Sequence, residues 1–103
     1  MKTPLNLFES LVVVAESQNL MEASSKLNVS QPALSVQLKK LAEGFKLPLF
    51  ETHGKKKVLT PFGLSVYKEV KRILGDIDSS FEEINRNYLT APNLIIRLGG
   101  RRE

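Results

Sequence analysis

With 103 residues, of which 42% are hydrophobic and 25% charged, the chain suits one small domain with a modest core. Its net charge of +4 is mild, and the lack of cysteine excludes disulfides, thiolate metal sites and a cysteine nucleophile. No apolar run approaches the roughly 20 residues of a membrane span, and the N-terminal MKTPLNLFES lacks the apolar run of a signal peptide. We therefore expect a cytoplasmic protein with no membrane partner.

Two helices are predicted at the start of the chain. The first is expected to open at Thr3-Pro4, an N-cap followed by a first-turn proline, with apolar residues at helical spacing from Leu5 to Ala15. The second is expected to begin after Asn19, because Glu22 lies three residues further on and completes the pattern of a capping box.

A third helix is predicted over about residues 31–43, after a tight turn at Asn28-Val29. Ser30 can cap this helix. At about 100° per residue, the later apolar residues fall within about 40° of Leu34 and predict a buried stripe of Leu34, Leu38, Leu41 and Phe45. The opposite face is mostly small, polar or basic and holds Pro32, Ser35, Val36, Lys39 and Lys40, with Gln31 at its N-terminal edge.

A small β-hairpin is predicted next. Its strands are expected at Leu49-Phe50-Glu51 and Val58-Leu59, with a turn near His53 to Lys56. Thr60-Pro61 repeats the pattern of a cap followed by proline, which predicts the start of a long helix.

The long helix carries apolar or aromatic residues at alternating steps of three and four. This is the a/d pattern of a coiled coil, sustained over about three heptads. An isolated helix has no need of such a stripe, so we predict that it pairs with a second copy; packing against its own domain is the alternative. The predicted dimerisation residues are Tyr67, Val70, Leu74, Ile77, Phe81, Ile84 and Tyr88.

Three short motifs, in this order and spacing, carry a family resemblance: VSQPALS (Val29–Ser35), LPLFE (Leu47–Glu51) and LTPFG (Leu59–Gly63). Over roughly residues 5–88 the chain resembles the N-terminal DNA-binding region of LysR-type bacterial transcriptional regulators. The resemblance implies a mainly α fold, with a winged helix-turn-helix in residues 1–60 and a linker helix for dimerisation in 61–90. Residues 91–103 are expected to be disordered or a shortened start of an effector domain.

The resemblance also implies how the domain binds DNA. The third helix would enter the major groove of double-stranded DNA, where small or polar side chains permit close approach, and the hairpin would follow the backbone as a wing. We expect a homodimer that binds an interrupted palindrome. Whether a full-length form assembles into higher oligomers is left open. The expected DNA-binding residues are Ser30, Gln31, Pro32, Ala33, Ser35, Val36, Lys39, Lys40, His53, Lys55, Lys56, Lys57 and Thr60.

Five residues depart from the usual family pattern. Lys46 replaces a frequent Gly, which leaves the geometry of that turn open. Ala42 and Thr52 stand where the family commonly has Glu and Arg; if that pair joins helix to wing, we expect this wing to be held by packing. Val36 replaces a frequent Arg or other polar residue and can pack on a thymine methyl, the alternative being an incidental exposed valine. Met21 replaces a Ser or Thr that often faces a phosphate, which implies a weaker backbone contact.

Other classes of function fit this sequence less well. An enzyme is not expected, since the chain has no glycine-rich phosphate loop and no acid pair with a supporting histidine. The single histidine, His53, predicts no metal site, and no cofactor is expected. The main alternative is a truncated interaction module that heterodimerises with a full-length regulator. A repressor of another winged-helix family is disfavoured by the serine-glutamine-proline and leucine-threonine-proline motifs.

Overall fold

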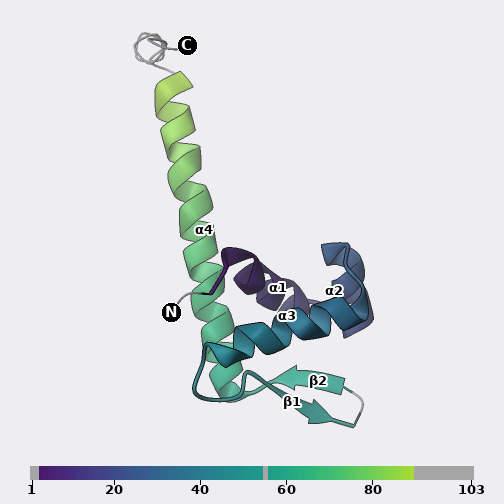
Figure 1. Ribbon diagram of the computed structural model, residues 1–103. Helices are drawn as coiled ribbons and strands as arrows, with labels where there is room; N and C mark the ends of the chain where they lie inside the picture. The colour runs from purple at the N-terminus through teal and green to yellow at the C-terminus, as the bar shows by residue number, and fades with distance from the viewer. Residues whose placement is uncertain (1–2, 55, 90–103) are drawn as a thin grey trace. The chain divides into compact units, whose positions relative to one another are not determined.

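The computed structural model describes residues 3–54 and 56–89 (Figure 1). The chain divides into two compact units, Met1–Lys71 and Arg72–Glu103. The mainly α winged helix-turn-helix with a long C-terminal helix, which the sequence predicts, is confirmed. The elements in chain order are α1 (Leu5–Glu16), α2 (Leu20–Leu27), α3 (Gln31–Glu43), β1 (Phe50–His53), β2 (Lys56–Leu59) and α4 (Pro61–Leu89).

The first two helices begin close to the predicted positions. The predicted cap at Thr3 is wrong: Pro4 is the N-cap of α1, and its extended ψ of 143° places it before the helix. The side chain of Asn19 caps α2 as predicted, accepting a hydrogen bond from the Glu22 amide at 2.8 Å. The Glu22 carboxylate accepts from the amide of Gln18 at 2.6 Å, one residue earlier than in the usual capping box.

The tight turn between α2 and α3 also follows the prediction. Asn28 takes the left-handed conformation, with φ of 61°, which asparagine tolerates better than most residues. The chain then enters α3 through Ser30, whose Oγ accepts a hydrogen bond from the Ala33 amide at 3.2 Å. These local features join α2 and α3 into the helix-turn-helix.

The core of the first unit is centred on the inner face of α3. The predicted stripe is confirmed, since Leu34, Leu38 and Leu41 are buried. Ala23 of α2 packs with Leu34 and Leu38, and the partly buried side chains around this cluster belong to Val13, Val14, Leu20, Leu27, Val29 and Phe50. The fourth predicted member, Phe45, is half-buried and makes an edge-to-face contact with Phe62, with ring centroids 6.0 Å apart.

A polar contact supplements this core between α1 and α3. Ser10 of α1 is buried, and its Oγ lies 3.0 Å from Oε1 of Gln37 on α3, to which it donates a hydrogen bond. Leu5, by contrast, is 53% exposed, so the apolar stripe of α1 begins at Leu7 rather than at Leu5. The two helices are thus joined by leucine packing and by a satisfied side-chain hydrogen bond.

The predicted hairpin is confirmed as an antiparallel pair in which Phe50 faces Leu59 and His53 faces Lys56. Leu49, which the sequence places in the first strand, precedes β1 and is only 1% exposed. It anchors the hairpin because its carbonyl accepts a hydrogen bond from the Thr60 amide at 3.0 Å. Packing of Leu49 and this backbone hydrogen bond therefore hold the base of the hairpin.

The start of α4 completes this anchor. The Thr60 hydroxyl donates to the Pro48 carbonyl at 2.7 Å and accepts from the Gly63 amide at 2.9 Å, so it caps α4 as predicted while joining it to the loop before β1. Gly63 is buried against this loop, and a Cβ there would lie 2.0 Å from the Leu49 carbonyl oxygen. Only glycine permits this approach.

Within residues 3–54 and 56–89, no helix is long and apolar enough to cross a membrane.

We predict that Gly63→Ala destabilises the domain by about 3 kcal/mol or more, because the added methyl group would collide with backbone atoms that cannot move aside freely. Urea denaturation followed by circular dichroism would measure the loss. Gly75→Ala is the matched control: a Cβ there meets nothing within 4 Å. It should be neutral or stabilising by up to about 1 kcal/mol. Equal effects of the two changes would contradict this account of the anchor.

Candidate nucleic-acid interface

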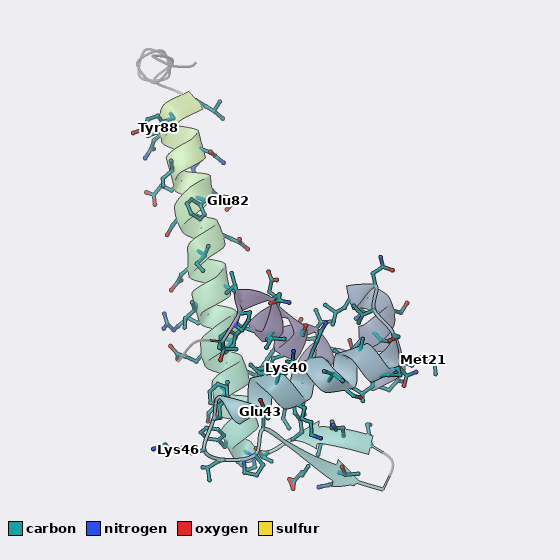
Figure 2. The ribbon with its side chains drawn as sticks, viewed as in Figure 1. Met21, Lys40, Glu43, Lys46, Glu82 and Tyr88 are labelled. Carbon is teal, nitrogen blue, oxygen red and sulfur yellow. The ribbon has the colours of Figure 1, made fainter. Side chains whose placement is uncertain are left out.

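The outward face of α3 carries the predicted recognition residues. They are all exposed: Ser30, Gln31, Pro32, Ala33, Ser35, Val36, Lys39 and Lys40. Figure 2 shows Lys40 on this helix and Met21 near the start of α2. Because the leucines of α3 are buried on its other side, these residues cannot turn inward without unpacking the core. The fold therefore displays them as one fixed surface.

The N-terminal end of α3 is suited to an anion. Its first turn contains no acidic residue. Free amides and the helix dipole place partial positive charge at an N-terminus. The Ser30 hydroxyl satisfies the Ala33 amide, and the Leu34 amide donates to the Ser30 carbonyl. Pro32 has no N–H, which leaves the amide of Gln31 in the first turn. Side chains around this end can therefore approach a phosphate without repulsion from a neighbouring carboxylate.

The hairpin supplies a second set of predicted residues. His53, Lys56 and Lys57 are exposed, whereas Lys55 lies outside the described residues. The Lys57 ammonium lies 5.9 Å from the centroid of the Phe50 ring, a cation–π distance that leaves the charge at the surface. Thr60 is half-buried, and its hydroxyl is used in the anchor of α4, so a contact with DNA stays a prediction.

A large groove of about 1170 Å³ joins the N-terminus of α3 to the hairpin. Gln31 lines it from α3, and Lys56 and Lys57 line it from β2. The rest of its wall includes Met21 of α2 and two residues between α1 and α2, Ser17 and Gln18. The sequence did not predict a DNA contact for Ser17 or Gln18. No local pattern could have revealed them, because tertiary packing alone brings this turn opposite β2.

A smaller groove, of about 420 Å³, lies between the outward face of α3 and the wing. Lys39 of α3 and Lys57 of β2 both line it, together with Ser35. Ala42 of α3 and Thr52 of β1 line the same groove, so these two side chains face one space. Two ammonium groups from separate elements thus border one concave surface. Within the described residues, no group of His, Cys, Asp or Glu is placed to hold a metal ion.

The first two residues of the predicted dimerisation seam are used by the first unit itself. Val70 is only 7% exposed and belongs to the domain's own core, so a dimer contact by Val70 stays a prediction. Tyr67 is half-buried, and its hydroxyl donates to the Glu16 carboxylate at 2.6 Å. Lys71 pairs with the same carboxylate, and its ammonium lies 5.8 Å from the Tyr67 ring centroid. This cluster of Glu16, Tyr67 and Lys71 ties α1 to the start of α4.

The remaining seam residues belong to the second unit. Leu74 is half-buried, while Ile77, Phe81, Ile84 and Tyr88 are between 37% and 62% exposed. Ile73, which the heptad pattern did not include, is also exposed and adds to the apolar character of this part of α4. Pairing through these residues stays a prediction. The predicted tail of residues 91–103 lies outside the described residues.

The family follows from a direct comparison with known proteins. The family model for bacterial regulatory helix-turn-helix proteins of the lysR family matches residues 5–64. The chain belongs to the LysR family. This match covers the helix-turn-helix, the wing and the anchor at the start of α4.

Curated members of the LysR family extend the likeness. The chain is 33% identical over 88 residues to the HTH-type transcriptional regulator XapR of Escherichia coli, covering 82% of this chain and 30% of that protein. It is 32% identical over 84 residues to the uncharacterized regulator YbhD of the same organism, covering 82% of this chain and 26% of that protein. The chain thus spans less than a third of either relative's length.

Solved structures of LysR-family proteins share the fold. The DNA-binding domain of BenM in complex with benA site 1 DNA superposes with a TM-score of 0.74 at 29% identity, covering 81% of this chain and 96% of that one. The LysR-family regulator CbnR superposes with a TM-score of 0.72 at 26% identity, covering 80% of this chain and 28% of that one.

The Glu16 cluster predicts a specific dependence of stability on pH. Hydrogen bonds from Lys71 and Tyr67 hold the pKa of Glu16 below its ordinary value of 4.5, and the bond to Glu16 raises the pKa of Tyr67. Since the pKa of Glu16 is lower in the folded state, its stabilising effect is present above the unfolded pKa and is lost as pH falls through the folded pKa.

Glu16→Gln should therefore destabilise the LysR-type domain modestly near neutral pH, and the difference from wild type should shrink as the pH falls below about 4.5. The free energy of unfolding in urea, measured at several pH values, tests this. In a background of Tyr67→Phe with Lys71→Met, the same Glu16 change should have little pH-dependent effect. A pH dependence that persists in this background would assign the effect to other partners of Glu16.

Proposed function

We propose that this domain is the DNA-binding part of a LysR-type transcriptional regulator and reads a specific double-stranded sequence. The observation that carries the proposal is the outward face of α3, whose small and polar residues are exposed beside lysines from both α3 and the wing. Support also comes from the family, from relatives named as transcriptional regulators, and from the likeness to a BenM domain in complex with DNA.

The two surfaces have different tasks in this proposal. The major groove of DNA displays a distinct pattern of donors and acceptors for each base pair, and a helix is narrow enough to enter it. Gln31, in the first turn of α3, has the amide that suits adenine, while Pro32 and Ser35 allow the helix to approach closely. Lys39, Lys56 and Lys57 contact phosphates, which fix the position of the domain without reading sequence.

The exposed apolar residues of α4 support a homodimer. Ile77, Phe81 and Ile84 are exposed in the single chain, and pairing with a second copy would remove them from water. A two-fold dimer presents two copies of α3, so its DNA site would be an interrupted palindrome. The same face would accept a full-length relative as a heterodimer, and the experiment below distinguishes the two cases.

Selection of random duplexes by the purified chain, followed by sequencing, should enrich an interrupted palindrome. Gln31→Ala should relax the preference at one position of each half-site, at a cost of about 1–3 kcal/mol in binding. Sedimentation of the protein with the selected duplex would give the stoichiometry. If the chain enriches a palindrome only after a full-length relative is added, the heterodimer is the functional species.

Lys56→Ala should weaken binding to all duplexes alike and lower the slope of log K against log salt by about 1, because one phosphate contact is lost. Fluorescence anisotropy over a series of salt concentrations would measure the slope. Lys68→Ala is the matched control, since Lys68 is another exposed lysine, on α4, that lines neither groove. Equal salt slopes for wild type and Lys56→Ala would remove the wing from the interface.

A further inference from the structure

Val36 is the one large hydrophobic residue of α3 that is exposed rather than buried. Its side chain is 54% exposed, whereas the leucines of the same helix at positions 34, 38 and 41 are at most 2% exposed. A β-branched residue has a lower helix propensity than alanine or leucine, and here it gains no packing in the core. Neither the stability of the helix nor the core of the domain explains a valine at this position.

The surroundings of Val36 combine apolar and basic groups. Residues four positions apart lie on one row of a helix, which places Val36 between Pro32 and Lys40. Ala33, three residues earlier, is also exposed and extends the apolar strip toward the N-terminus of α3. Lys39 lies next to this strip on the same face. A small apolar patch flanked by lysines suits a partner that offers apolar groups within an anionic surface.

The major groove of DNA is such a partner. The C5-methyl group of thymine is the apolar feature that base pairs display there, between two phosphate backbones. The valine side chain has no donor or acceptor, so a polar base edge pressed against it would lose its hydrogen bond to water without compensation. A thymine methyl loses nothing in that contact. The stiff χ1 of valine in a helix also holds its two methyl groups in one direction.

We propose that Val36 recognises a thymine methyl in each half-site and thereby makes one position of the operator prefer thymine. This inference rests on the proposed DNA-binding function and adds to it a residue that determines specificity through apolar contact. It differs from the role of Gln31, which depends on hydrogen bonds, and from that of the wing lysines, which depends on charge.

The test replaces each thymine of the selected duplex, one at a time, by deoxyuridine, which removes only the methyl group. For the wild-type chain, one thymine in each half-site should show an affinity about fourfold lower after replacement, the effect expected for one buried methyl-sized group. In Val36→Ala the same replacement should have almost no effect. Because Val36 is exposed, this variant should unfold within about 2–4 °C of wild type, which thermal denaturation checks.

A second arm restores the methyl group on a different base. At the sensitive position, cytosine should bind wild type weakly, and 5-methylcytosine should recover part of the affinity, while Val36→Ala should not distinguish the two. Leu5→Ala is the control variant, because it shortens a similarly exposed aliphatic side chain on α1 that lines neither groove, and it should keep the deoxyuridine sensitivity. These expectations concern ratios between duplexes, so a uniform loss of affinity in a variant does not affect them.

Three outcomes would overturn the inference. If wild type binds thymine and deoxyuridine duplexes equally at every position, Val36 reads no methyl group, although sequence-specific binding stands. If the sensitivity survives in Val36→Ala, another residue makes the contact. If the purified chain selects no sequence at all, with or without a full-length relative, both the inference and the proposed function fail.

Discussion

Burial of the leucine stripe of α3 is the constraint on which the interface depends. Leu34, Leu38 and Leu41 are almost completely withdrawn from water, and Ala23 of α2 packs directly against the first two. Rotating α3 about its axis would expose these leucines, at a cost of about 1.5–3 kcal/mol for each. The outward direction of Gln31 and Val36 is therefore fixed by the hydrophobic effect, although neither residue takes part in the core.

The wing is positioned by a different kind of interaction. Leu49 is buried, its carbonyl accepts a backbone hydrogen bond from Thr60, and Gly63 lets α4 begin against the same carbonyl. This arrangement holds the base of the hairpin through packing and backbone atoms rather than through charged side chains. The consequence for binding is that Lys57 and Lys39 border one groove from two elements whose backbones are fixed independently.

The long helix serves two purposes along its length. Its first turns belong to the DNA-binding domain: Val70 completes the core, and Tyr67 and Lys71 bind the Glu16 carboxylate at the end of α1. Further along, Phe81 and Ile84 expose apolar surface. The heptad pattern therefore runs through a part of α4 that is buried in its own domain and a part that is exposed. A 3.5-residue repeat indicates an apolar helix face, and it does not distinguish packing against the same domain from packing against another chain.

Local chemistry in the sequence determined much of this protein. Asn19, Ser30 and Thr60 cap the helices that the sequence assigns to them, and the 3.6-residue period of α3 predicts its buried face, because capping and helical periodicity act over only a few residues. The start of α1 is an exception, since a proline there suits either the N-cap or the first turn. Only the tertiary structure decided that Val70 belongs to the core, that Ser17 and Gln18 face β2, and that Lys39 shares a groove with Lys57. Those relations join residues distant in the chain, and their distances depend on how whole elements pack, which no local pattern records.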